Sequence, residues 1–163
     1  AEVIALATRA TRLIRQQCEQ QPETRWQYEY SPETFCFTEP EFALEICEAV
    51  AEIWQPCDER PMVINLPATV EVSTPNVYLD QIEYFCHYFS RRSDVCNSVH
   101  PQNDRDTGVA SAELAVVVVI SIVGPVSEAP PGIHRHDTKC AVPEVFLLAG
   151  PARRCCLHEH HVR

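Results

Sequence analysis

Apolar and polar positions along the first two thirds of the chain alternate with two periods, one typical of helices and one typical of strands. Helical spacing over residues 3–14 predicts an amphipathic helix, and a polar loop follows over residues 16–24. Aromatic and polar residues then alternate in Arg25–Tyr30, which predicts a strand that ends at Ser31. The apolar face expected for this first helix consists of Val3, Leu6, Ala7, Ala10, Leu13 and Ile14.

A second helix is expected after residue 38, because Thr38 and Glu41 have the spacing of a capping box and Pro40 closely follows the cap. The next apolar run, Met62–Leu66, is almost without polar residues, which predicts a strand buried on both faces. The apolar stripe expected for the second helix is Phe42, Ile46, Val50 and Ile53.

A third helix is expected to begin at Thr74 and Pro75, and a strand over Val95–Val99 and a helix over Thr107–Ala115 follow it. The inner face of the third helix is expected to consist of Tyr78, Ile82, Phe85 and Phe89. Helices and apolar strands thus alternate, which is typical of an α/β fold with a parallel sheet, either open or closed as a barrel.

Composition and charge narrow the possible functions. The 163 residues include 23 acidic and 13 basic side chains, so the formal net charge is −10. This charge argues against a nucleic-acid or anionic-membrane partner, which would need clustered Lys and Arg. The longest apolar run, Leu114–Val123, is too short to span a bilayer, and no signal peptide is visible.

The nine cysteines are odd in number and irregularly spaced, which does not suit a disulfide framework. We therefore expect most of them to be small buried side chains in a reducing compartment, either the cytoplasm or the mitochondrial matrix.

Polar residues follow each predicted strand directly, at Glu33, Thr69 and His100. Reacting groups in parallel α/β folds sit at the carboxyl ends of strands, so these three residues are candidates for one site. Each also has a plain structural interpretation: Glu33 in the first turn of the next helix, Thr69 as a loop hydroxyl, and His100 as a solvated histidine. All three are expected at the same edge of the sheet, here called the rim, and this shared placement favours a functional site over the three separate structural interpretations.

Four segments closely resemble the catalytic barrel of 2-isopropylmalate synthases: YSPETF, NLPATVEVSTPNVY, DQIEYF and VHPQNDRDTGVASAEL. The resemblance covers residues 1–115 and implies an incomplete (β/α)8 TIM barrel, comprising about strands 5 to 7 with flanking helices. These enzymes condense acetyl-CoA with 2-oxoisovalerate (3-methyl-2-oxobutanoate) to give 2-isopropylmalate in leucine biosynthesis. The intact enzymes would be homodimers that use a divalent metal, Zn, Mg or Mn.

The resemblance also implies roles for individual residues. Glu33 matches the active-site glutamate, Thr69 the threonine that contacts the carboxylate of the 2-oxo acid, and His100 the first of two metal-binding histidines. Gln102 stands where the second histidine is expected, and its amide oxygen is a weaker ligand than imidazole. Asp106 stands where the family usually has glycine. We therefore expect metal binding and catalytic turnover to be lost.

Residues 116–163 match nothing in that family except Leu147–Gly150, and we expect an unrelated, irregular tail. A translated intron or a frame change would explain it. The tail is rich in His and Cys, which leaves open an adventitious zinc site or chance composition.

Two further functions stay open. The chain could be a non-catalytic remnant or interaction module that binds a full-length synthase, or a condensing enzyme similar to homocitrate or citramalate synthases.

Overall fold

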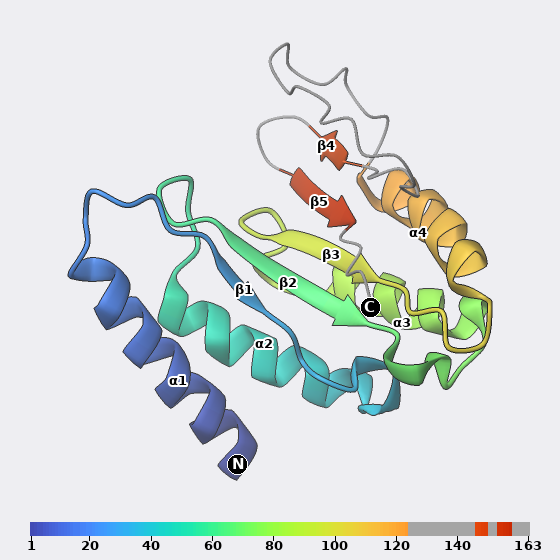
Figure 1. Cartoon of the computed structure of the whole chain (residues 1–163), viewed down its shortest axis with the longest axis horizontal. Coiled ribbons are helices and arrows are strands. Elements are labelled where there is room, and N and C mark those ends of the chain that lie inside the picture. Colours follow the sequence, from blue (N-terminus) through green and yellow to red (C-terminus); the bar gives the residue numbers. More distant parts are fainter. Residues whose placement is uncertain (124–145, 150–152, 158–163) are drawn as a thin grey trace.

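A computed structural model of the chain describes residues 1–123, 146–149 and 153–157, with side chains for residues 1–115. Helices and strands alternate as the sequence predicts (Figure 1). The elements in chain order are α1 Glu2–Glu19, β1 Tyr28–Tyr30, α2 Pro40–Trp54, β2 Met62–Pro67, α3 Pro75–Tyr88, β3 Cys96–His100, α4 Gly108–Val123, β4 Phe146–Ala149 and β5 Arg153–Leu157. Short 3-10 turns, η1 Phe35–Phe37 and η2 Thr69–Glu71, follow β1 and β2.

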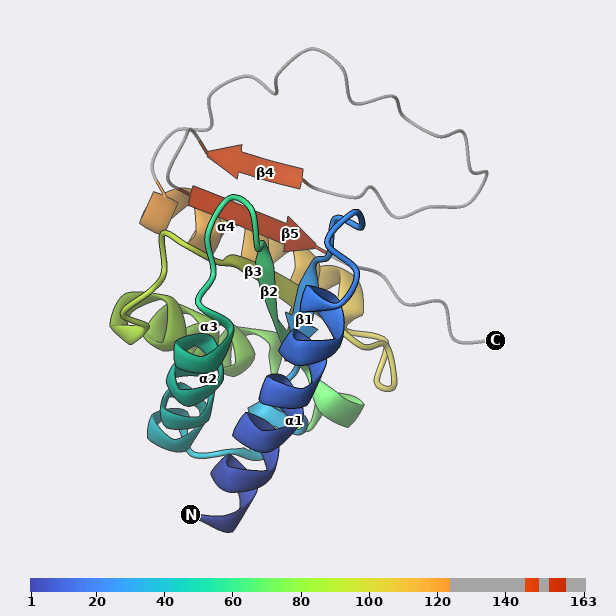
Figure 2. The same cartoon turned by 90° about the vertical axis from the view of Figure 1, so that its left-hand side faces the viewer.

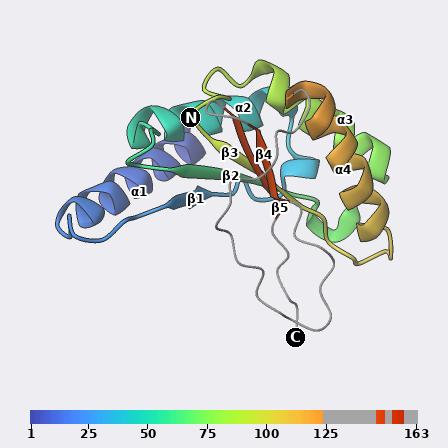
Figure 3. The same ribbon diagram turned by 90° about the horizontal axis from the view of Figure 1, so that it is seen from above.

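The strands form one sheet in the order β1-β2-β3-β5-β4. Strand β2 pairs in parallel with β1 and β3, and the register places Asn65 opposite Ser98 and Pro67 opposite His100. The predicted α/β fold with a parallel sheet is therefore confirmed for β1, β2 and β3, whereas β4 pairs with β5 in the antiparallel direction. Closure into a barrel stays a prediction. Figure 3 shows the helices arranged along one side of β1, β2 and β3, and Figure 2 shows α1 and α2 side by side.

The core lies between the three strands and the helices. Along β2, Met62, Ile64 and Leu66 belong to this core, whereas Val63 and Asn65 alternate with them and face the other side of the sheet. All six residues of β2 are buried, which confirms the prediction of a strand covered on both faces. The inner face expected for α3 is also confirmed, because Tyr78, Ile82, Phe85 and Phe89 are each at most 2% exposed.

The predicted apolar face of α1 is wrong except at Ala7. Leu6 and Leu13 are both 58% exposed, and the ridge that packs against the core consists of Ile4, Ala7, Thr11 and Cys18. Thr11 is fully buried because its hydroxyl pairs with the hydroxyl of Tyr28 at 2.9 Å. A hydroxyl that is hydrogen-bonded can thus be buried in the core, although the pattern of apolar residues does not place it on the packed face. The helix also runs on to Glu19, five residues beyond the predicted end.

The predicted capping box at the start of α2 is wrong as well. The N-cap is Glu39, because Pro40 is the first helical residue and holds its predecessor in an extended conformation. Thr38 lies outside the helix, and its hydroxyl donates to the carbonyl of Thr34 at 3.0 Å. Glu41 still favours the helix start, since it places negative charge in the first turn.

Helix α4 crosses the predicted boundary at residue 115 and ends at Val123. The tail is not irregular throughout, because Phe146–Ala149 and Arg153–Leu157 form strands β4 and β5. The boundary itself stays a prediction. The tail residues His134, His136, Cys140, His158, His160 and His161 lie outside the described residues.

Two expectations from composition can be compared with the structure. Of the cysteines in the described residues 1–115, Cys36, Cys47, Cys86 and Cys96 are buried, Cys18 is half-buried and Cys57 is exposed. None of these six thiols forms a disulfide. Within the described helices, none is long and apolar enough to cross a membrane.

Candidate functional site

Asn65 connects the carboxyl ends of the three parallel strands. Its side-chain nitrogen, Nδ2, donates to the hydroxyl of Ser31 after β1 at 2.8 Å. The same nitrogen lies 3.3 Å from Nδ1 of His100 at the end of β3. The backbone confirms this closeness, because the amide of Ala68 donates to the carbonyl of His100 at 3.0 Å. The strand ends predicted to share one rim are therefore brought together.

Buried polar atoms without hydrogen-bond partners lie beside this connection. Asn65 is 4% exposed and Ser98 is fully buried, yet Oδ1 of Asn65 and Oγ of Ser98 have no partner among the described residues. The two residues face each other in the sheet register, on the side away from the helices. Since buried polar groups are nearly always paired, these atoms are available to a polar ligand.

Thr69 opens the turn that follows β2, and its hydroxyl is also buried without a partner in the described residues. The thiol of Cys36, from the segment after β1, donates to the Thr69 carbonyl at 3.4 Å. Burial raises the pKa of this thiol above its ordinary value, so Cys36 remains a protonated donor. The contact fixes the backbone of Thr69 and leaves its hydroxyl free to bind.

The side chain of Gln102 is already engaged by the neighbouring loop. Its amide oxygen accepts a hydrogen bond from the backbone amide of Val70 at 2.8 Å. In the part of the chain with described side chains, no group of three or more His, Cys, Asp or Glu could hold a metal ion. The expected loss of the divalent-metal site that the family resemblance implies stays a prediction, and the donors present for such a site are His100 and an amide oxygen of Gln102 that is already hydrogen-bonded.

Glu33 lies in the same rim region but is not drawn into the Asn65 contacts. Its side chain is exposed, and its backbone carbonyl accepts a hydrogen bond from the hydroxyl of Thr34 at 2.6 Å. Of the predicted site residues, His100 lies beside Asn65, Thr69 and Gln102 lie on the adjoining loops, and Glu33 stands at the solvent-exposed edge.

The loop between His100 and α4 depends on the absence of a side chain at Gly108. A Cβ there would lie 2.6 Å from the carbonyl oxygen of Gln102 and 3.0 Å from Oδ1 of Asn103. That Asn103 oxygen also accepts a hydrogen bond from the Gly108 amide at 3.1 Å. The backbone of the loop is thus closed tightly onto the start of α4.

We expect Gly108→Ala to lower the free energy of unfolding by about 1–3 kcal/mol, because the methyl group meets a backbone oxygen that cannot rotate away. This cost exceeds the gain in helix propensity of about 1 kcal/mol. Urea unfolding followed by circular dichroism measures the effect. Ala110→Ser, which adds one atom at an exposed position of the same helix, should change stability by less than about 0.5 kcal/mol. A more stable Gly108→Ala variant would contradict the expectation.

Sequence reasoning missed Asn65 and Ser98. Both stand in strands dominated by buried residues, and Asn65 is the single polar side chain in Met62–Pro67. A polar residue that interrupts a buried strand needs a partner, and this signal could have identified Asn65. Ser98 was less visible, since serine is also common as a small filler in strands.

Residues 1–124 match the model of the HMGL-like family. The chain is 60% identical over 114 residues to the 2-isopropylmalate synthase of Marinomonas sp. (strain MWYL1), covering 70% of this chain and 20% of that protein. It is 54% identical over 112 residues to the 2-isopropylmalate synthase of Pseudomonas putida (strain GB-1), covering 69% and 20%.

A third relative, the 2-isopropylmalate synthase of Ralstonia pickettii (strain 12J), is 53% identical over 112 residues, again covering 69% of this chain and 20% of the relative. The chain therefore spans about a fifth of the length of the curated relatives it matches. The family match over residues 1–124 includes the helices and strands that carry the rim.

Proposed function

Because the chain belongs to the HMGL-like family, we propose that its rim is the 2-oxo-acid-binding part of a 2-isopropylmalate synthase site. The observation that carries the proposal is the pair of buried hydroxyls, on Thr69 and Ser98, that lack hydrogen-bond partners in the described residues. They lie near the Asn65 side chain, which joins Ser31 and His100. The substrate that we propose is 2-oxoisovalerate, and the partner in the condensation is acetyl-CoA.

The unpaired groups of the rim suit a small, polar, anionic ligand. The hydroxyls of Thr69 and Ser98 have no partner in the described residues and can donate to a carboxylate or keto oxygen. Thr69 would bind the carboxylate of the 2-oxo acid. Glu33, exposed at the edge of the rim, would stand where an intact synthase needs a group for the proton transfer of the condensation.

We propose that this 163-residue chain binds the 2-oxo acid without condensing it. The family's divalent metal would polarise the keto group of the 2-oxo acid. Here Gln102 gives its amide oxygen to the Val70 amide, so it makes a poor substitute for a second imidazole ligand. The reducing compartments expected from the cysteines, the cytoplasm or the mitochondrial matrix, remain part of the proposal.

Binding and turnover can be measured separately on the full 163-residue chain. We expect 2-oxoisovalerate to give saturable ligand-line broadening in NMR, and we expect no CoA thiol to be released when acetyl-CoA is added. Thr69→Val should weaken the binding, whereas Thr8→Val, a matched change on α1, should not. Equal binding by both variants would contradict the assignment of Thr69, and released CoA would contradict the proposed inactivity.

Titration with pyruvate and 2-oxoglutarate in the same NMR assay distinguishes this proposal from a related condensing enzyme. Preferential binding of either compound over 2-oxoisovalerate would favour a citramalate or homocitrate synthase-like site.

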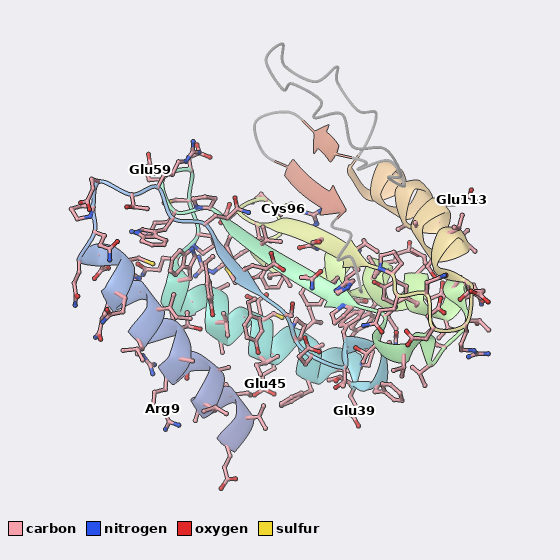
Figure 4. All side chains as sticks on the ribbon, in the orientation of Figure 1. Arg9, Glu39, Glu45, Glu59, Cys96 and Glu113 are labelled. Carbon is pink, nitrogen blue, oxygen red and sulfur yellow. The ribbon has the colours of Figure 1, made fainter. Side chains whose placement is uncertain are left out.

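A second candidate function is docking onto a full-length synthase, and the surface of α1 favours it. Val3, Leu6 and Leu13 are each at least 57% exposed and lie along one stripe of the helix. Figure 4 shows Arg9 projecting from the same helix. Co-purification with the Marinomonas synthase tests this function. A complex that is lost in Leu6→Glu but kept in Thr8→Val would support it.

A further inference from the structure

Glu71 is a buried carboxylate in the turn after β2, at the point where Thr69 begins that turn. Its side chain is only 3% exposed. Burying a carboxylate is unfavourable unless hydrogen bonds replace the lost water. The groups that replace the water come from the loop after β3, residues 101–107.

Two donors from that loop reach the carboxylate. The backbone amide of Arg105 donates to Oε2 of Glu71, and the hydroxyl of Thr107 donates to Oε1 at 2.6 Å. The connection also runs in the opposite direction, because Nη1 of Arg105 donates to the carbonyl of Glu71 at 3.0 Å. Glu71 therefore joins the loop after β2 to the loop after β3 through its side chain and its backbone.

The turn that Glu71 holds has an unfavourable backbone conformation. Val70 has φ 50° and Glu71 has φ 46°, so both lie in the left-handed region although neither is glycine. A β-branched residue is especially disfavoured there. Such conformations persist only where surrounding contacts hold them. The contacts available are the Glu71 carboxylate with Arg105 and Thr107, and the Val70 amide with Gln102.

We propose that Glu71 is a positioning residue that locks the turn after β2 onto the loop after β3 and thereby fixes the Thr69 hydroxyl relative to His100. The hydrogen-bond acceptors of Glu71 perform this role. A ligand that contacts both Thr69 and His100 then meets a preformed site, without having to order two loops. The ligand-binding part of this inference rests on the proposed function, whereas the linkage of the two loops does not.

Amide hydrogen exchange on the full chain tests the linkage, and the Val70 amide is the informative probe. Glu71 does not touch this amide, which donates to Gln102. In Glu71→Met, which keeps the bulk but loses the acceptors, we expect the Val70 amide to exchange at least about tenfold faster. Amides of the core strand β2 should keep their protection. In Glu71→Gln, whose oxygen and nitrogen can still pair with Arg105 and Thr107, exchange should return to within about twofold of the original.

Glu113→Met serves as the matched control, because Glu113 is exposed and projects from α4 (Figure 4). This variant should leave the Val70 amide unchanged. If Glu71→Met fails to fold, Thr107→Val removes one of the two donors and should accelerate the same amide. Unchanged exchange at Val70 in Glu71→Met, or equal loss of protection across β2, would overturn the proposal.

The affinity for 2-oxoisovalerate separates the two proposals. We expect Glu71→Met to weaken it at least about fivefold and Glu71→Gln to restore it, because a loosened turn must be ordered on binding. If the original chain shows no binding, the proposed function fails, and the exchange of the Val70 amide still decides the linkage. If the chain binds but Glu71→Met binds equally well, the positioning role fails.

Discussion

Replacing Trp54 by alanine is expected to lower the free energy of unfolding by about 3–5 kcal/mol, the range typical of a buried aromatic side chain. Trp54 is 1% exposed at the end of α2. Its ring centroid lies 4.7 Å from that of Tyr28 on β1. Its indole nitrogen donates to the carbonyl of Arg60 at 3.2 Å. The truncation would thus leave a cavity between α2, β1 and the loop before β2 and remove one of two hydrogen bonds to the Arg60 carbonyl, which also accepts from the Cys57 amide at 3.2 Å.

Urea unfolding followed by circular dichroism measures this loss, and the chain provides a matched control. Trp26 is 38% exposed in the loop before β1. Trp26→Ala should therefore cost clearly less than Trp54→Ala, since more than a third of the Trp26 surface is already in water. Equal unfolding midpoints for the two variants would contradict the placement of Trp54 in the core.

Replacing Gln102 by histidine is expected to tighten zinc binding at the rim by about a hundredfold. Structural zinc sites with four ligands have apparent binding free energies of about 10–16 kcal/mol, so each ligand contributes about 3 kcal/mol. That contribution corresponds to about two orders of magnitude in affinity. The gain is expected because His100 already lies at the end of β3 and a second imidazole would stand two residues further along.

Isothermal titration calorimetry with zinc measures the affinity of the original chain and of Gln102→His. Both contain the same tail, so the difference between their affinities excludes any zinc bound there. The double variant Gln102→His with His100→Ala should lose the gain, because the two imidazoles act together. A gain that survives this second change would place the zinc elsewhere. The Val70 amide loses its acceptor in Gln102→His, so a stability loss of about 0.5–1.5 kcal/mol should accompany the gain in affinity.

The strands and the inner face of α3 could be predicted because each depends on a local pattern. The apolar run of β2 and the spacing of Tyr78, Ile82, Phe85 and Phe89 leave few alternatives. The packed face of α1 could not be predicted, since it contains Thr11, whose burial depends on a distant hydroxyl on Tyr28. Hydrogen bonds between residues far apart in sequence do not produce a periodic pattern from which they could be predicted.

The candidate site divides in the same way. Glu33, Thr69 and His100 could be located because they follow predicted strands, and parallel strands end at one edge. The glycine that the family resemblance places at position 106 also has a physical basis, because Asp106 has φ 59° in this structure. The contacts of Gln102 and Glu71 could not be foreseen, since they join two loops whose shapes depend on each other.

The left-handed residues have a consequence for how this protein could evolve. Among the described residues, the non-glycine residues with positive φ are Thr34, Gln55, Val70, Glu71 and Asp106. All except Gln55 lie in the loops that follow β1, β2 and β3. Glycine at these positions would relieve strain, yet it would also give the loops freedom that a ligand must then remove. Replacing them by glycine would therefore favour stability at the expense of a stiff rim, so the two properties are set against each other at these positions.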